Sequence, residues 1–157
     1  RKLTTLLFIL FWGGTSTAQD IASYKAEDLM KRVKSSNDTF YVVNFWATWC
    51  IPCVQELPYF EQLLKKYKSE KMKVILVSLD FRKQVAKSLI PFMQKKNLQS
   101  QVVLLDDKNA NTWINLVDSS WSGALPATLI LNKKQRLFFE KSFNFEELEK
   151  VYLSSKK

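Results

Sequence analysis

The sequence contains no histidine and only two cysteines, Cys50 and Cys53. A structural zinc site takes four ligands, mostly cysteine and histidine, and the chain has no other residue of either type to complete one. Covalent haem attachment needs a histidine directly after the second cysteine, where this chain has Val54. These absences argue against a metal or haem site, and we expect no metal and no cofactor.

The sequence also lacks internal repeats, linkers and low-complexity tracts. Its 157 residues fit one domain, and 46% hydrophobic residues indicate a globular chain rather than a disordered one. The net charge of +9 comes from dispersed lysines without the basic and aromatic cluster of a nucleic-acid surface. We therefore expect no nucleic-acid partner and interpret the lysines as a solvated surface. Attraction to acidic partners or anionic lipid is a lesser alternative.

Residues 1–19 differ from the rest of the chain. Two basic residues precede an apolar run over 3–12 and small residues over 13–18, which is the layout of a secretory signal peptide cleaved after Ala18 or Gln19. The alternative is an uncleaved anchor, with residues 1–18 tethering the protein to a membrane, although the apolar run is short for a span. Either interpretation predicts a periplasmic or otherwise extracytoplasmic protein, where disulfides persist, with its folded domain over 20–157.

The two cysteines lie between a strand pattern and a helix pattern. Residues 40–46 are rich in β-branched and aromatic side chains, which predicts a buried strand. Apolar residues then recur at helical spacing from Leu57 to Tyr67. We therefore expect Cys50 where the strand ends and Cys53 within the first turn of the next helix, one turn apart and at disulfide distance.

This position favours redox chemistry. Unpaired backbone N–H groups and the helix dipole stabilise a thiolate at a helix start, which lowers a thiol pKa from about 8.5 to roughly 3.5–7.5. Cys50 is the expected attacking thiolate and Cys53 the expected resolving thiol. A purely structural disulfide is the weaker interpretation, because closing a ring of roughly four residues constrains little of the unfolded chain.

The remaining pattern predicts alternating strands and helices after an opening amphipathic helix within 20–38. We expect strands over 73–79, 101–105, 122–131 and 136–141, with the last two forming a hairpin. Helices are expected over 84–96, kinked at Pro91, and over 109–117. A final helix begins at Asn144, where Glu147 three residues later completes a capping box.

Residues 43–53, followed by Glu56-Leu57-Pro58, resemble the thioredoxin superfamily, and within it the exported TlpA/ResA-like thiol–disulfide oxidoreductases. The resemblance covers residues 38–155. It implies an α/β thioredoxin-like fold with a central mixed sheet of about five strands flanked by helices. It also implies a TlpA-type β/α insertion around residues 84–105.

The resemblance assigns roles to further residues. Pro126 matches a cis-proline beside the dithiol, which leaves the backbone of Leu125 free to pair with an incoming peptide. An ordinary trans-proline opening an edge strand is the alternative. Together with Trp49 and Pro52, these two residues form the expected substrate-binding set. The redox-active disulfide is expected between Cys50 and Cys53.

Glu56 matches a buried acidic residue of the ResA-like branch. On one helix face with Cys53, a poorly solvated carboxylate could raise the thiol pKa values and relay a proton. The alternative is a surface glutamate that interacts favourably with the helix dipole. Asn44 stands where thioredoxin carries an aspartate, and a neutral amide cannot accept the proton there.

The resemblance favours a reductase of disulfides in extracytoplasmic proteins, recharged by a membrane-bound electron donor. The same residues could run in reverse as a disulfide-forming oxidase. Two further hypotheses are a thiol peroxidase and a non-catalytic, peptide-binding adaptor with the thioredoxin fold.

Overall fold

The computed structural model describes residues 21–34 and 38–156, so the segment expected to be a signal peptide or anchor lies outside the described residues. The elements in chain order are β1 (Ser23–Tyr24), α1 (Ala26–Lys34), β2 (Phe40–Trp46), α2 (Ile51–Lys66), β3 (Met72–Ser78), the 3₁₀-helix η1 (Arg82–Gln84), the π-helix η2 (Val85–Leu89), α3 (Ile90–Lys96), β4 (Gln101–Leu105), α4 (Ala110–Val117), β5 (Ala127–Leu131), β6 (Arg136–Phe139) and α5 (Phe145–Ser154). The predicted α/β organisation is confirmed.

The six strands form one mixed sheet in the order β1-β4-β3-β2-β5-β6. The pairs from β1 to β2 are parallel, and β5 and β6 are antiparallel additions on the other side of β2. All seven residues of β2 are buried, as expected for a continuous apolar strand with helices on both faces. The carboxyl ends of β2 and β3 therefore meet at one edge of the sheet, beside the start of β5.

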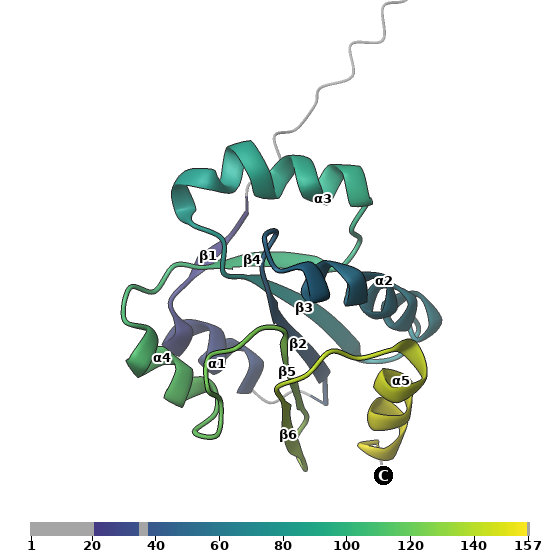
Figure 1. Ribbon diagram of the computed structural model, residues 1–157. Helices are drawn as coiled ribbons and strands as arrows, with labels where there is room; N and C mark the ends of the chain where they lie inside the picture. The colour runs from purple at the N-terminus through teal and green to yellow at the C-terminus, as the bar shows by residue number, and fades with distance from the viewer. Residues whose placement is uncertain (1–20, 35–37, 157) are drawn as a thin grey trace, which may run out of the picture.

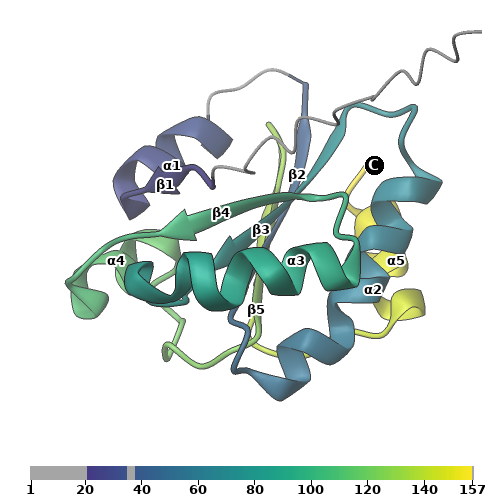
Figure 2. The same cartoon turned by 90° about the horizontal axis from the view of Figure 1, so that it is seen from above.

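The helices cover the two faces of the sheet (Figures 1 and 2). On β2, Val42 and Trp46 belong to the apolar cluster under α2, α3 and α5, whereas Val43 and Phe45 belong to the cluster under α1 and α4. This division follows from the alternation of side chains along a strand. The dithiol lies in the first of the two clusters, with Cys50 and Cys53 among its members.

The opening segment differs from the prediction of a helix within 20–38. The described part of that segment begins with β1, and α1 starts only at Ala26. Ser23 and Tyr24 pair in parallel with Leu104 and Leu105 of β4. A two-residue strand has no periodicity of its own, so the apolar face of the following helix masked it in the sequence. This strand is the sixth of the sheet, where the sequence predicted about five.

The insertion around residues 84–105 is confirmed as a helical segment followed by β4, which lies between β1 and β3 in the sheet. Its helix is less regular than predicted, because a 3₁₀-turn and a π-helix precede α3. Pro91 is the second residue of α3, but the chain is already helical through η2, so its missing N–H falls inside a continuous helical segment. In place of the kink expected at Pro91, the helix has a π-helical turn directly before α3.

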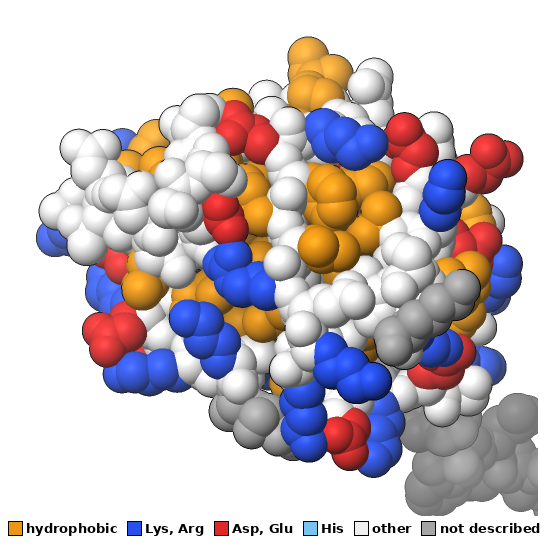
Figure 3. All heavy atoms as spheres, turned by 90° about the horizontal axis from the view of Figure 1, so that it is seen from below, with side chains coloured by type: hydrophobic (Ala, Val, Ile, Leu, Met, Phe, Trp, Pro, Cys, Tyr) orange, Lys and Arg blue, Asp and Glu red, His pale blue; other side chains and the backbone are white. Residues whose placement is uncertain are grey.

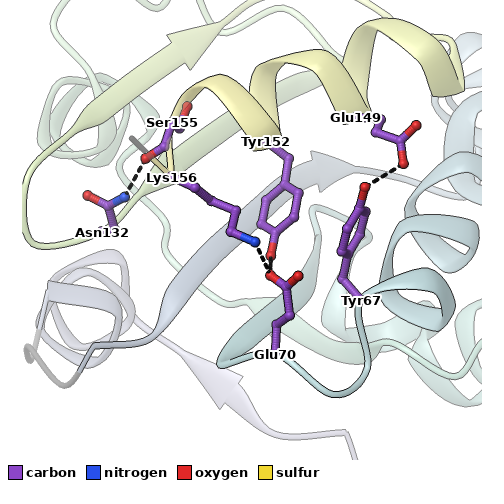
Figure 4. Close-up of polar contacts among 7 residues, drawn as sticks. All are labelled: Tyr67, Glu70, Asn132, Glu149, Tyr152, Ser155 and Lys156. Carbon is purple, nitrogen blue, oxygen red and sulfur yellow. Dashed lines mark hydrogen bonds and ion pairs between the residues drawn. The ribbon is translucent and has the colours of Figure 1, made fainter.

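The last helix, α5, is docked by polar contacts to Tyr67, the C-cap residue of α2, and to Glu70 shortly after it (Figure 4). The hydroxyls of Tyr67 and Tyr152 donate to Glu149 and Glu70, the first over 2.6 Å, and the two rings lie 4.7 Å apart. Lys156 adds an ion pair to Glu70 at 2.6 Å. The predicted capping box is present, with Asn144 accepting from the Glu147 N–H.

Seen from below, the surface carries lysine and arginine side chains mixed with acidic and apolar ones (Figure 3). Several of these charges are paired, as Lys133 is with Asp38 over 2.7 Å. Exposed pairs of this kind contribute little to stability. In the part of the chain that the structure covers, no helix is both long and apolar enough to cross a membrane.

Candidate active site

Three segments meet at the edge of the sheet where β2 and β3 end. The register pairs Phe45 of β2 with Val77 of β3 and with Ala127 of β5. A turn of four residues then leads from β2 into α2, with the Cys50 N–H donating to the Ala47 carbonyl over 3.1 Å. The topology thus brings the cysteine turn, the end of β3 and the segment before β5 together.

Cys50 and Cys53 are joined by a disulfide with their Cα atoms 5.3 Å apart. Cys50 is the N-cap residue of α2 and Cys53 lies in the first turn, as the spacing predicts. Cys50 retains 7% of its surface and Cys53 none, so an incoming sulfur can approach only Cys50. In the dithiol form, the unpaired N–H groups and positive end of α2 would stabilise a Cys50 thiolate.

Glu56 is buried, so it is the interior carboxylate of the first interpretation and not a surface glutamate. Its Oε1 accepts from Asn44 Nδ2 over 2.8 Å, and its Oε2 accepts from the Phe143 N–H over 2.7 Å. Burial raises the pKa of Glu56 from 4.5 to about 7, while the bonds from Phe143 and Asn44 act in the opposite direction. The carboxyl group can therefore gain or lose a proton near neutral pH.

Asn44 lies in the middle of β2 and is fully buried. Its amide also donates to Thr128 Oγ1 of β5 over 3.1 Å, so it links the central strand to both α2 and β5. Its own Oδ1 has no hydrogen-bond partner among the described residues. Asn44 therefore holds Glu56 through its Nδ2 donor, while its Oδ1 is left as a buried acceptor.

A shallow depression of about 520 Å³ surrounds the exposed side of the disulfide. It is lined by Trp49, Cys50, Ile51, Pro52, Leu79, Gly123, Ala124 and Leu125. Trp49 and Ile51 are 59% and 73% exposed, which is unusual for large apolar side chains and typical of a docking surface. The depression carries no charged side chain, so it suits an apolar stretch of a partner.

The loop before β5 forms the far wall of this depression. The peptide bond between Leu125 and Pro126 is cis. Gly123 has a φ of +94°, which other residues rarely adopt, and a Cβ there would lie 2.9 Å from Ile114 Cδ1, so glycine is favoured. The Trp121 indole N–H donates to the Ala124 carbonyl over 2.8 Å and holds the loop. Pro126 is buried, and Leu125 remains partly exposed beside the disulfide.

The sequence interpretation missed one group, the carboxylate of Asp80. Asp80 is 3% exposed and follows β3 by two residues. Its oxygens accept from the backbone and hydroxyl of Thr48, in the cysteine turn, and from the hydroxyl of Ser78. An acidic residue just after a buried parallel strand lies at the edge where Cys50 lies, and this was the available signal. Over the described residues, no group of three or more His, Cys, Asp or Glu side chains is placed to hold a metal.

The fold and the Cys-x-x-Cys disulfide, accessible only at Cys50, define a thioredoxin-like protein. Residues 15–139, more than half of the chain, match the AhpC/TSA family, and the chain belongs to that family. The resemblance to this superfamily is therefore confirmed.

Curated relatives carry matching names. The chain is 34% identical over 93 residues to the thioredoxin-like protein YneN of Bacillus subtilis (strain 168), an alignment that covers 59% of this chain and 50% of YneN. It is 27% identical over 125 residues to the thiol-disulfide oxidoreductase ResA of the same organism, covering 78% of this chain and 65% of ResA. The chain thus spans about half to two thirds of the length of these two relatives.

Solved structures share the fold. A thioredoxin-related protein from Neisseria meningitidis serogroup B superposes with a TM-score of 0.65 at 23% identity, covering 80% of this chain and 91% of that one. StoA from Bacillus subtilis superposes with a TM-score of 0.56 at 22% identity, covering 75% and 85%. The expected thioredoxin-like fold is confirmed.

Proposed function

We propose that this protein is a thiol–disulfide oxidoreductase that reduces disulfides of extracytoplasmic proteins through Cys50 and Cys53. The observation that carries the proposal is the asymmetry of the pair: Cys50 caps α2 at the surface, and Cys53 is buried one helical turn before Glu56. A disulfide with one accessible sulfur can exchange with a partner and then be closed from inside.

The reaction has two exchange steps. In the dithiol form, the Cys50 thiolate attacks one sulfur of a substrate disulfide, which forms a mixed disulfide and releases one substrate thiolate. Cys53 then loses its proton and attacks Cys50 Sγ, which releases the second substrate thiolate and forms the Cys50–Cys53 bond. The substrate gains two electrons and the protein loses two, and a thiol or dithiol donor must return them.

Glu56 suits the role of proton acceptor for Cys53. It lies three residues after Cys53, on the same face of α2, and its pKa of about 7 permits exchange at neutral pH. Asn44, held against it, cannot accept a proton as the carboxylate can. We assign the proton that leaves Cys53 to Glu56.

The charge-free depression suits the substrate. Trp49 and Pro52 on one side, and Leu125 and Pro126 on the other, flank the accessible sulfur, so an extended substrate segment can lie between them. Two solved structures of similar fold are of a secreted disulfide oxidoreductase from Mycobacterium tuberculosis and a secreted thiol–disulfide isomerase from Corynebacterium glutamicum. The secretion of these two proteins supports an extracytoplasmic location for this one. A membrane-bound thiol donor is the electron source that we propose.

Reduction of a model protein disulfide, such as insulin, tests the proposal. The dithiol form alone should reduce insulin stoichiometrically, and with dithiothreitol supplied it should do so catalytically. Cys50→Ser should abolish both activities. Consumption of hydrogen peroxide with no insulin reduction would instead indicate a thiol peroxidase. Native partner activity that survives Cys50→Ser would indicate an adaptor with idle cysteines.

A further inference from the structure

We propose that Asp80 is a positioning residue that clamps the cysteine turn to the end of β3 and so holds Cys50 in register with Cys53. The inference rests on the proposed function, since it concerns the same dithiol. Asp80 is a buried carboxylate that the exchange steps do not use.

Asp80 is surrounded by hydrogen-bond donors. Its Oδ1 accepts from Thr48 Oγ1 over 2.5 Å, and its Oδ2 accepts from the Thr48 N–H over 3.1 Å. Ser78 Oγ donates to Oδ2 over 2.7 Å and accepts from the Asp80 N–H over 3.0 Å. None of the ion pairs found among the described residues includes Asp80. Hydrogen bonds alone therefore compensate the burial of this carboxylate.

The bonds from Thr48 matter because Thr48 lies in the turn that leads to Cys50. Thr48 is the second residue of the turn in which the Cys50 N–H donates to the Ala47 carbonyl. The N–H of a second turn residue points away from the turn and finds no partner within it. Asp80 supplies that partner from the neighbouring strand. Because the Leu79 N–H donates to the Trp46 carbonyl over 2.8 Å, β3 follows β2 up to this point and carries Asp80 rigidly.

A fixed turn favours the disulfide. The equilibrium between dithiol and disulfide depends on how closely the two sulfurs are held in bonding geometry, that is, on their effective concentration. Cys53 is held by α2, whereas Cys50 lies at the junction of the turn and the helix. Removing the clamp from the turn therefore lowers the effective concentration of Cys50 relative to Cys53 and makes the disulfide easier to reduce.

The test is the equilibrium constant of the Cys50–Cys53 disulfide against glutathione, measured at 25 °C with variants shown to be folded by circular dichroism. Asp80→Ala should shift the equilibrium toward the dithiol by about three- to tenfold, or about 15 to 30 mV. Thr48→Val, which removes only the hydroxyl donor, should shift it in the same direction by less. Thr48→Ser should behave as the wild type.

Asp118→Ala is the matched control. Asp118 accepts from the backbone and hydroxyl of Ser120, as Asp80 does from Thr48, and it also pairs with Arg136, but it lies in the loop after α4 and outside the depression. This variant should leave the equilibrium constant unchanged even if it lowers stability. An effect through general destabilisation would move both aspartate variants together and would overturn the inference.

The outcomes separate the inference from the proposed function. If Asp80→Ala fails to fold, Thr48→Val decides alone: a shift supports the clamp, and an unchanged constant overturns it. If the wild-type protein has a reversible dithiol couple and Asp80→Ala has the same equilibrium constant against glutathione, the clamp is refuted and the proposed function is not. A wild-type protein without any reversible couple would refute the proposed function itself.

Discussion

Asn44 in the central strand donates its amide to Glu56 in α2 over 2.8 Å, and both side chains are buried. This bond joins the middle of the sheet to the helix that carries both cysteines. A carboxyl group held in this way is poorly hydrated, so its proton is easier to keep and its ionised form is costly. The site therefore places a group that titrates near neutrality one helical turn from the buried thiol.

Glu56 should make the stability of the oxidised protein depend on pH. Its pKa rises from 4.5 when unfolded to about 7 when folded, so below pH 4.5 both states hold the proton. Between pH 4.5 and 7 only the unfolded state loses it, and the free energy of unfolding should fall by about 3 kcal/mol as pH rises. Urea unfolding at pH 5 and pH 8 measures this difference.

Glu56→Gln provides the comparison. A glutamine does not titrate. Its amide can donate to Asn44 Oδ1, which has no partner among the described residues, once the Asn44 side chain turns over. The variant should lose most of the fall in stability between pH 5 and pH 8. An equally steep fall in Glu56→Gln would show that another group is responsible.

Cys53→Ser should trap the intermediate of the exchange. Because Cys53 is fully buried and Cys50 is at the surface, the first attack should proceed and the second should not occur. Mass spectrometry should find a stable mixed disulfide between Cys50 and a substrate protein. Cys50→Ser should trap almost none, and equal trapping by both variants would contradict the assigned roles.

Trp49→Ala should weaken the docking of protein substrates. Its side chain is 59% exposed beside Cys50, so the loss should cost little stability but about 1 kcal/mol of binding, or roughly a fivefold rise in KM. Reduction of a small disulfide such as oxidised glutathione should change much less. Leu153→Ala, on an exposed position of α5, should leave both activities unchanged.

Tyr152→Phe should loosen α5. The Tyr152 hydroxyl donates to Glu70 from an almost fully buried ring, and its loss should lower the free energy of unfolding by about 1 kcal/mol (Figure 4). Burial and the Glu70 carboxylate raise the pKa of Tyr152 above 10, so this contribution is present below pH 10 and is lost as pH rises further. Urea titrations at pH 7 measure the difference, with Tyr59→Phe, at a partly buried position of α2, as a control.

The long, uniform elements could be predicted from the sequence. The strands β2 and β4 were predicted at the observed residues, because polar residues on either side of a continuous apolar run mark where the strand begins and ends. The two-residue β1 and the π-turn before α3 were not, since neither has enough residues to set a period. Their conformations depend on pairing with β4 and on packing against the sheet.

The part of the site that lies within one short stretch of sequence could be predicted. The cysteines and Glu56 lie within two turns of one helix, and their spacing alone indicates a common face. The burial of Glu56 depends on Phe143, which is 87 residues away, and the clamp on Thr48 depends on Asp80, which is 32 residues away. Contacts of this kind follow from the order of strands in the sheet, which no local pattern contains.

The reduction potential of the Cys50–Cys53 couple tests the central claim most directly, by equilibration of the protein against glutathione or dithiothreitol buffers. A reductase that depends on a dedicated donor should have a potential near or below the roughly −270 mV of thioredoxin. A value near the roughly −120 mV of a strong oxidant would contradict the account and indicate a disulfide-forming enzyme instead.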